Sequence, residues 1–246
     1  MGSTVWSSTA FCSVGNIFKN NVKLVHRPQP GPSGETGLVA AMVGALWHPA
    51  AMSESSMKAD LRRYLQLSRE AVLGKLEGLS PYECRRPLVP TGTNLLGLVK
   101  HLAGVEAEYF GATFDRPFPQ NLPWIADDAE PNVDMWADAG ESVEGIVAQY
   151  RRVWAHSDAT VAALSLDSLG QVPWWPADRR EVTLHRILIH MIAETNRHAG
   201  HADLVRELVD GTVGLRADND NLAPGDAAWW EAYREKLDRV ARDATD

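Results

Sequence analysis

Four side chains that commonly bind metal ions recur along the stretch LHRILIHMIAETNRHAGHADLVREL, residues 184–208. A helix turns about 100° per residue, so His190, Glu194, His198 and His201 would share a stripe about 80° wide. Glu194 and His198 stand at i and i+4, where Cβ atoms are about 5–6 Å apart. Two side chains at that separation can bind one ion at the ~2.0–2.2 Å distances of zinc. The spacing therefore predicts a metal site that takes a further ligand from another helix.

The stripe also has a plainer interpretation, because the exposed face of a surface helix is polar and a Glu–His pair at i,i+4 can form there. Ile187, Met191, Leu204 and Leu208 lie near the same side of this helix and favour an orientation towards the protein interior. Spacing alone leaves a buried metal site and a solvated face open as alternatives.

The composition indicates an acidic globular protein. The 246 residues carry a net charge of −8, and the pI is about 5.5. Because phosphate backbones attract basic patches, nucleic acid is not an expected partner. Cys12 and Cys84 are too few for a disulfide framework or a cysteine-based zinc site. No apolar run reaches the ~18–20 residues of a membrane span, so we expect a cytoplasmic protein without membrane contact.

Helical periodicity dominates the chain, and no alternating strand pattern is present. Apolar residues at i, i+3 and i+4 predict four long helices within residues 58–78, 93–114, 139–164 and 183–208. Asp226 would cap a further helix whose apolar face, Trp229 to Val240, packs on the body. The expected fold is all-α, a four-helix bundle with long crossover loops and a C-terminal accessory helix.

The N-terminal part of the chain differs from the rest. Residues 1–55 are rich in Ser, Asn, Gly and Pro and lack a sustained helical period. The apolar patch at residues 38–47 follows a segment too long for an ordinary signal peptide. We therefore expect residues 1–55 to form a poorly ordered extension and residues 56–246 to form the helical domain.

The candidate for the missing ligand is His101, in the second predicted helix. It shares a helical face with Gly97 and Gly104, which would let another helix approach closely. A single histidine in a helix is more often a packing or surface residue, so the position alone does not decide its role.

Two loops stand out for their tryptophans. Trp124 lies in the irregular stretch at residues 115–135, which is long for a helix–helix connection, and such loops are often functional. Trp174 and Trp175 lie between prolines and would form either a lid or a plug at one end of the bundle.

Four stretches carry a resemblance to known proteins: PTGTNLLGLVKHLAGVE, PWWPADRREVTLHRIL, HMIAETNRHAGHADLVRE and DNDNLAPGDAAWW. On these stretches the domain resembles the DinB-like superfamily of four-helix metalloproteins, in the actinobacterial branch that includes mycothiol-dependent S-transferases. The resemblance implies a divalent metal bound by His101, Glu194 and His198. Members usually have histidine where Glu194 stands, but a His₂Glu set with an open position is also a catalytic zinc arrangement. His201 and His190 would be reserve ligands or would orient the ligands.

The resemblance also implies a function. A divalent metal, with zinc the first choice, would bind mycothiol or a similar low-molecular-weight thiol and deprotonate it for attack on an electrophile. Trp124 and Trp175 would contact the substrate. Glu106, within the family-like stretch, would be the catalytic acid or base, with Glu108 on the face of His101 as the alternative. Solvated surface charges are the plainer interpretation of both residues.

Other functions stay open at this point. Relatives that use the same thiol to isomerise substrates make an isomerase one alternative, and a hydrolase with metal-activated water is another. A non-enzymatic, stress-associated bundle would instead hold its metal with four protein ligands. A homodimer is expected by analogy alone.

Overall fold

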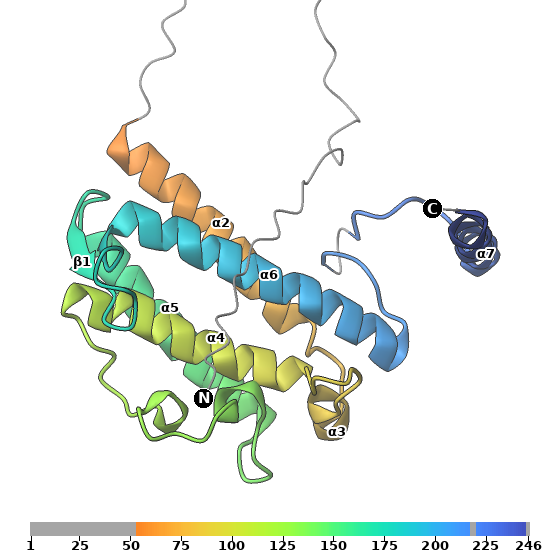
Figure 1. Ribbon diagram of the computed structural model, residues 1–246, viewed down its shortest axis with the longest axis horizontal. Helices are drawn as coiled ribbons and strands as arrows, with labels where there is room; N and C mark the ends of the chain where they lie inside the picture. The colour runs from red at the N-terminus through yellow and green to blue at the C-terminus, as the bar shows by residue number, and fades with distance from the viewer. Residues whose placement is uncertain (1–52, 217–219, 245–246) are drawn as a thin grey trace, which may run out of the picture. The chain divides into compact units, whose positions relative to one another are not determined.

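The computed structural model describes residues 53–216 and 220–244, so nearly all of the extension predicted for residues 1–55 lies outside the described residues. The main body consists of four long helices: α2 (Glu54–Gly74), α4 (Leu95–Phe110), α5 (Val143–Ala163) and α6 (Leu184–Asp210). Helix α4 packs against both α5 and α6, and α2 packs against α6 (Figure 1). The described part of the chain is predominantly helical, which confirms the all-α prediction.

Each long helix begins with a side chain that accepts a hydrogen bond from a backbone amide three residues on. These caps are Ser53, Asn94, Ser142 and Thr183. The cap of α4 is therefore one residue later than residue 93, where the sequence predicted that this helical segment begins. The short helix α3 (Pro81–Arg85) follows α2 and begins with a capping box.

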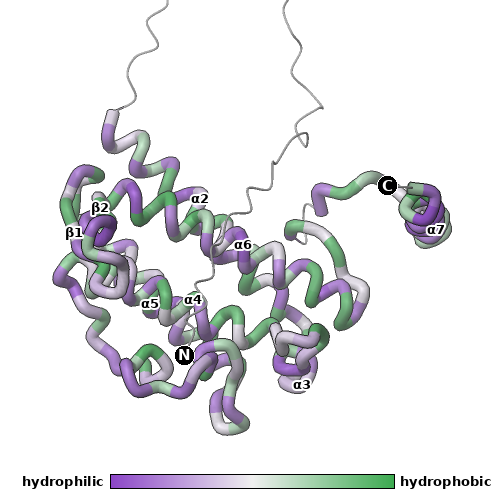
Figure 2. Tube along the Cα trace, in the orientation of Figure 1, coloured by the Kyte–Doolittle hydropathy of each residue, from purple (hydrophilic) through white to green (hydrophobic). Residues whose placement is uncertain are grey.

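Helix α4 is central to the body, and most of its residues are buried. Leu98 and Leu102 of α4 are completely buried, as are Ile187 and Met191 of α6. Figure 2 shows hydrophobic residues interspersed with hydrophilic ones along both helices. Removing the hydrophobic set from water is the main term that stabilises such a bundle.

The C-terminal end of α6 departs from the expectation of an inward stripe. Leu204 is 64% exposed and Leu208 is 56% exposed. The predicted inward orientation is therefore wrong for these two residues, although it holds for Ile187 and Met191. The reason is tertiary, because this end of the helix is covered on the side of Val205 and Arg206, which are buried, and not on the side of Leu204 and Leu208.

A small antiparallel sheet precedes α6. It consists of β1 (Leu169–Gln171) and β2 (Glu181–Thr183), and Gly170 pairs with Val182. The prediction of no strands is wrong for these two segments, because three residues are too few for an alternating pattern to stand out. The turn between the strands carries Trp174 and Trp175.

Helix α7 (Ala227–Asp243) begins at Asp226 as predicted, but none of its residues is buried. Trp229 and Tyr233 are 42% and 40% exposed. The prediction that its aromatic face packs on the body is therefore wrong. Neither α7 nor any other described helix combines the length and hydropathy needed to span a membrane.

The connection from α4 to α5 contains three short 3₁₀ helices: η1 (Ala112–Phe114), η2 (Pro123–Ile125) and η3 (Val133–Met135). Both η1 and η3 contact α4. A Cβ on Gly104 would lie 2.6 Å from Cγ2 of Ile125 in η2. The absence of a side chain at Gly104 thus lets the connection between α4 and α5 lie close to α4. The sequence had instead suggested that another helix would approach at this glycine.

Candidate metal centre

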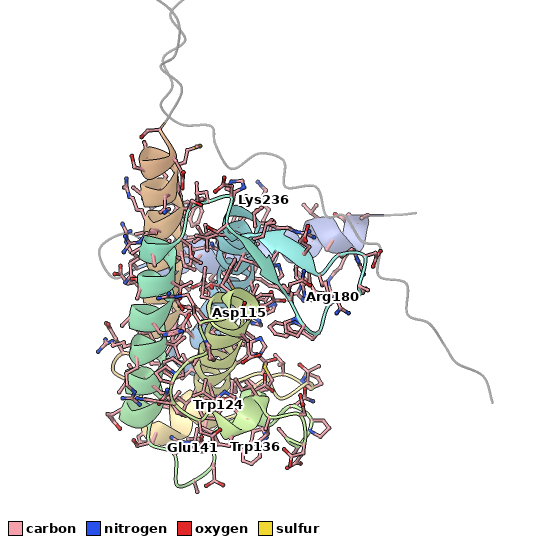
Figure 3. The ribbon with its side chains drawn as sticks, turned by 90° about the vertical axis from the view of Figure 1, so that its left-hand side faces the viewer. Asp115, Trp124, Trp136, Glu141, Arg180 and Lys236 are labelled. Carbon is pink, nitrogen blue, oxygen red and sulfur yellow. The ribbon has the colours of Figure 1, made fainter. Side chains whose placement is uncertain are left out.

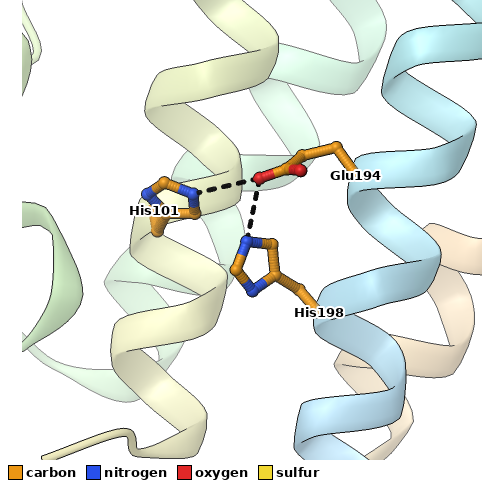
Figure 4. Close-up of side chains that lie close together, drawn as sticks. All are labelled: His101, Glu194 and His198. Carbon is orange, nitrogen blue, oxygen red and sulfur yellow. Dashed lines mark hydrogen bonds and ion pairs between the residues drawn. The ribbon is translucent and has the colours of Figure 1, made fainter. Parts of the chain in front are cut away.

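Three side chains from two helices meet between α4 and α6 (Figure 4). Oε1 of Glu194 lies 3.0 Å from Nε2 of His198 and 3.7 Å from Nε2 of His101. Ligand atoms of the three residues all lie within 4.8 Å of one another. The structure therefore brings together the three predicted metal ligands, which we call the triad.

The two helices account for this arrangement. Glu194 and His198 lie on successive turns of α6 and project from the same face. His101 lies on α4, which packs against α6. The imidazole rings of His101 and His198 have centroids 4.8 Å apart and an interplanar angle of 69°. Both rings thereby present Nε2 to the same carboxylate.

Electrostatic interactions shift the pKa values of His101 and Glu194. Burial lowers the pKa of His101, but interactions with Glu194 and Asp134 outweigh it, so the pKa is raised. Hydrogen bonds from His101 and His198 lower the pKa of Glu194 far below its usual range. Glu194 is therefore ionised at neutral pH.

The triad suits a divalent metal ion. Imidazole nitrogens and a carboxylate oxygen are common zinc ligands, and the ionised Glu194 offsets part of the ion's charge. Three protein ligands leave a coordination position for a substrate, as in catalytic zinc sites. Within residues 53–216 and 220–244, the triad is the one group of potential ligands close enough to hold an ion.

The two predicted reserve ligands contact other groups. Nδ1 of His201 lies 3.4 Å from Nδ1 of His198, the ring nitrogen that does not face Glu194. His190 packs against Tyr109 and Trp175, with ring centroids 4.6 Å and 5.4 Å apart. Burial lowers the pKa of His190, so its ring is neutral at pH 7. Neither residue therefore adds a ligand atom to the triad in this arrangement.

Glu106, the predicted acid or base, lies apart from the triad. Its side chain is 0% exposed and forms a buried ion pair with Arg69 of α2. Nη1 of Arg69 also lies 3.0 Å from Oδ1 of Asp158 in α5. Because Glu106 has no exposed surface, it cannot contact a substrate in this conformation. Its position favours a structural role that links α2, α4 and α5.

The two tryptophans predicted to contact substrate each pack on a residue that lies one helical turn from a member of the triad. Trp124 lies in η2 against Gly104, one turn after His101 on α4. The indole N–H of Trp175 donates to the hydroxyl of Tyr109 at 3.1 Å. Trp175 also packs on His190, one turn before Glu194. Substrate contact by either residue stays a prediction.

One carboxylate that the sequence did not single out contacts the triad directly. Oδ2 of Asp134, in η3, lies 2.6 Å from Nδ1 of His101. Asp134 is one of several acidic residues in a long connection, 33 positions after its partner. No local pattern marks it, and only the packing of η3 on α4 brings it to the ring.

The fold and the triad define an all-α class of protein, in which two packed helices bring together two histidines and a carboxylate that could hold a metal ion. The sequence model of the Mycothiol-S-transferase family matches residues 60–211, which is more than half of the 246 residues. The chain therefore belongs to the Mycothiol-S-transferase family, and the resemblance drawn from its motifs is confirmed. None of the curated proteins compared with the chain matches it.

Proposed function

We propose that the protein is a metal-dependent thiol transferase that uses mycothiol, or a similar low-molecular-weight thiol, at an ion held by His101, Glu194 and His198. The observation that carries the proposal is the convergence of these three ligand atoms within 4.8 Å. The match to the Mycothiol-S-transferase family supports the thiol as co-substrate.

When bound, a divalent ion such as zinc would lower the pKa of the thiol so that thiolate is present near neutral pH. The protein's own residues prepare the site for this chemistry. The two imidazoles present Nε2 atoms to one point, and Glu194 supplies a negative charge beside them. In the overall reaction the thiol loses its proton, a sulfur–carbon bond forms, and the leaving group departs from the electrophile.

An aromatic cluster next to the triad would contact the electrophile. Tyr109, Trp175 and His190 pack on one another with ring centroids 4.6–6.0 Å apart. His190 lies one helical turn before Glu194, so the cluster adjoins the triad along α6. We assign substrate contact to Trp175 in this cluster and to Trp124, which packs against Gly104 one turn after His101.

A proton acceptor is also needed near the triad, and Glu108 suits this role better than Glu106. Glu108 stands seven residues after His101, on the same face of α4. It is half-buried, and burial together with Asp127 raises the pKa of its carboxyl group. A carboxyl group with a raised pKa is a better proton acceptor near neutral pH.

The metal content of the purified protein tests the first half of this proposal. We expect about one divalent ion per chain in the wild type by elemental mass spectrometry, and loss of the ion in His198→Ala, which removes a ligand. His185→Ala is the matched control, because His185 is an exposed histidine on the same helix. An equal metal content in all three proteins, or none after reconstitution with zinc, would contradict the proposed site.

Thiol consumption tests the second half. The metal-loaded wild type should accelerate the reaction of mycothiol with monobromobimane, and His198→Ala should not. A metal-loaded protein that neither binds nor consumes the thiol would exclude the transferase and leave a structural metal site. A reaction that returns the thiol unchanged and rearranges the second substrate would instead indicate an isomerase.

A further inference from the structure

The ring of His101 contacts carboxylates at both of its nitrogens. Nε2 faces Glu194, whereas Nδ1 lies 2.6 Å from Oδ2 of Asp134 in η3. A hydrogen bond in which Nδ1–H donates to Asp134 leaves the lone pair on Nε2, the nitrogen that belongs to the triad. Partners of this kind determine the orientation of ligand histidines in metal sites.

The next residue of η3 is held on α4 by two features of that helix. Nδ2 of Asn94 donates to the backbone oxygen of Met135 at 3.0 Å. A Cβ on Gly97 would lie only 1.8 Å from the same oxygen, a distance that no side chain could occupy. Asn94, Gly97 and His101 stand at i, i+3 and i+7 and so lie on one face of α4. Glycine at position 97 therefore allows η3 to lie directly on this face.

A third attachment follows at Trp136. Nζ of Lys100 donates to the backbone oxygen of Trp136 at 3.1 Å and forms an ion pair with Glu141 at 2.8 Å. The same ammonium group lies over the rings of Trp124 and Trp136, 5.0 Å and 5.9 Å from their centroids. Trp124, Trp136 and Glu141 gather in one region of the molecule (Figure 3). Lys100 is only 4% exposed, so this is a buried attachment.

Three consecutive residues of the connection, Asp134, Met135 and Trp136, thus contact α4 or its N-cap. Asp134 contacts His101, and the backbone oxygens of Met135 and Trp136 accept hydrogen bonds from Asn94 and Lys100. Two of the attachments involve backbone oxygens and determine where η3 lies. The third involves the carboxylate of Asp134 and meets the ligand ring. A shift of η3 would therefore move Asp134 away from His101.

We propose that η3 is a positioning element for the metal site, in which Asp134 orients the His101 imidazole and Gly97 and Lys100 keep Asp134 in place. None of these three residues is a metal ligand. The proposal rests on the metal site of the proposed function, and it holds or fails independently of the thiol and the electrophile.

Zinc titration by isothermal calorimetry tests the role of Asp134. Asp134→Ala should weaken zinc affinity roughly 10–100-fold, the loss typical when the partner of a ligand histidine is removed. Asp134→Asn keeps an acceptor and should weaken affinity less. Asp128→Ala, an exposed aspartate of the same connection, is the matched control and should bind zinc as the wild type does.

A spectroscopic measurement separates positioning from a merely structural role. The zinc-loaded wild type should show a slowly exchanging, downfield Nδ1–H resonance from His101 by NMR. This resonance should disappear in Asp134→Ala while the melting temperature of the metal-free protein stays unchanged. Its persistence in Asp134→Ala would contradict the assigned hydrogen bond.

A double-mutant cycle tests whether Gly97 acts through Asp134. Gly97→Ala should weaken zinc affinity about as much as Asp134→Ala, because its methyl group displaces Met135. When Gly97→Ala is added to Asp134→Ala, zinc affinity should fall no further, since the contact between Asp134 and His101 through which Gly97 acts is already absent. Gly200→Ala is the control, because a Cβ there meets nothing within 4 Å. If Gly97→Ala fails to fold, Lys100→Met replaces it in the same cycle.

The possible outcomes separate the two proposals. If the wild type binds zinc and Asp134→Ala binds it equally well, or if the two substitutions weaken binding additively, the positioning element is excluded and the metal site remains. If the wild type binds no divalent ion at all, both proposals are excluded. If Asp134→Ala binds zinc more weakly than the wild type, and the zinc-loaded wild type does not consume the thiol, the positioning element is supported and the transferase is excluded.

Discussion

At the scale of single residues, Glu194 has the charge that a metal ligand needs. A glutamate binds a metal ion in its ionised form, and the two imidazoles beside Glu194 favour that form by lowering its pKa. Histidine is another side chain that could serve as a ligand at this position. Both side chains are zinc ligands and reach similar distances from an i,i+4 pair.

We therefore predict that Glu194→His retains the metal, whereas Glu194→Ala loses it because two ligands remain. Elemental mass spectrometry of the purified variants measures this. Glu207→Ala, an exposed glutamate of the same helix, should behave as the wild type. A full metal content in Glu194→Ala would show that Glu194 is not a ligand.

Glu106 belongs to a different kind of site, because its burial and its pairing with Arg69 favour stability over catalysis. Glu106→Gln leaves the buried Arg69 without its main counter-ion, and breaking such a pair typically costs about 3–5 kcal/mol of unfolding free energy. Urea unfolding should report this loss, and Glu130→Gln on the surface should stay within about 0.5 kcal/mol of the wild type. Unchanged stability with lost thiol transfer would instead restore the catalytic role first predicted for Glu106.

At the scale of elements, one side chain of α6 ties the end of α2 to the bundle. Nη1 of Arg206 donates to the backbone oxygens of Lys75 at 2.9 Å and of Glu77 at 2.8 Å. Nη2 of Arg206 lies 2.7 Å from Oδ2 of Asp210. Asp210 thus holds the guanidinium in the orientation that satisfies carbonyl groups where α2 ends.

This pair predicts a pH dependence of stability. Hydrogen bonding to Arg206 lowers the pKa of Asp210 from its usual 3.8 to about 2 in the folded protein. The ionised pair therefore stabilises the fold fully above about pH 4, and the contribution is lost as the pH falls through about 2. Asp210→Asn should lower the unfolding free energy by about 1 kcal/mol at pH 6, since the carboxylate is partly exposed.

Urea unfolding between pH 6 and pH 2 measures this dependence. The difference between the wild type and Asp210→Asn should shrink below pH 4. A difference that stays constant over this range would show that the charge of Asp210 contributes nothing to stability.

At the scale of the whole molecule, burial is concentrated in α2, α4, α5 and α6, while α7 has no buried residue. The match to the Mycothiol-S-transferase family also ends at residue 211, before α7 begins. The stability of the body and the proposed metal site should therefore not depend on α7.

Deletion of residues 227–246 should accordingly leave the thermal unfolding midpoint and the metal content unchanged. Differential scanning calorimetry measures the first quantity. Deletion of residues 204–246 is the contrasting variant, because it also removes the buried Val205 and Arg206 and should unfold the protein. A large fall in the midpoint on deletion of α7 alone would show that α7 stabilises the body.

The sequence by itself predicted the four long helices and α7, with ends shifted by a few residues, and two of the three triad residues, whereas α3 and the 3₁₀ helices were not predicted. Helical periodicity and capping are local, so they can be read from neighbouring residues. The same periodicity placed Glu194 and His198 on one face of α6 without any knowledge of the fold. His101 followed from the resemblance, and the structure places it beside the other two.

Only the tertiary structure decided which further groups meet these residues. Asp134 reaches His101 through the packing of η3 on α4, Glu106 turns away to Arg69, and Leu204 and Leu208 stay exposed. Each of these outcomes depends on how segments distant in sequence pack together. Local patterns specify the face of a helix but not what covers it, because coverage depends on contacts between distant segments.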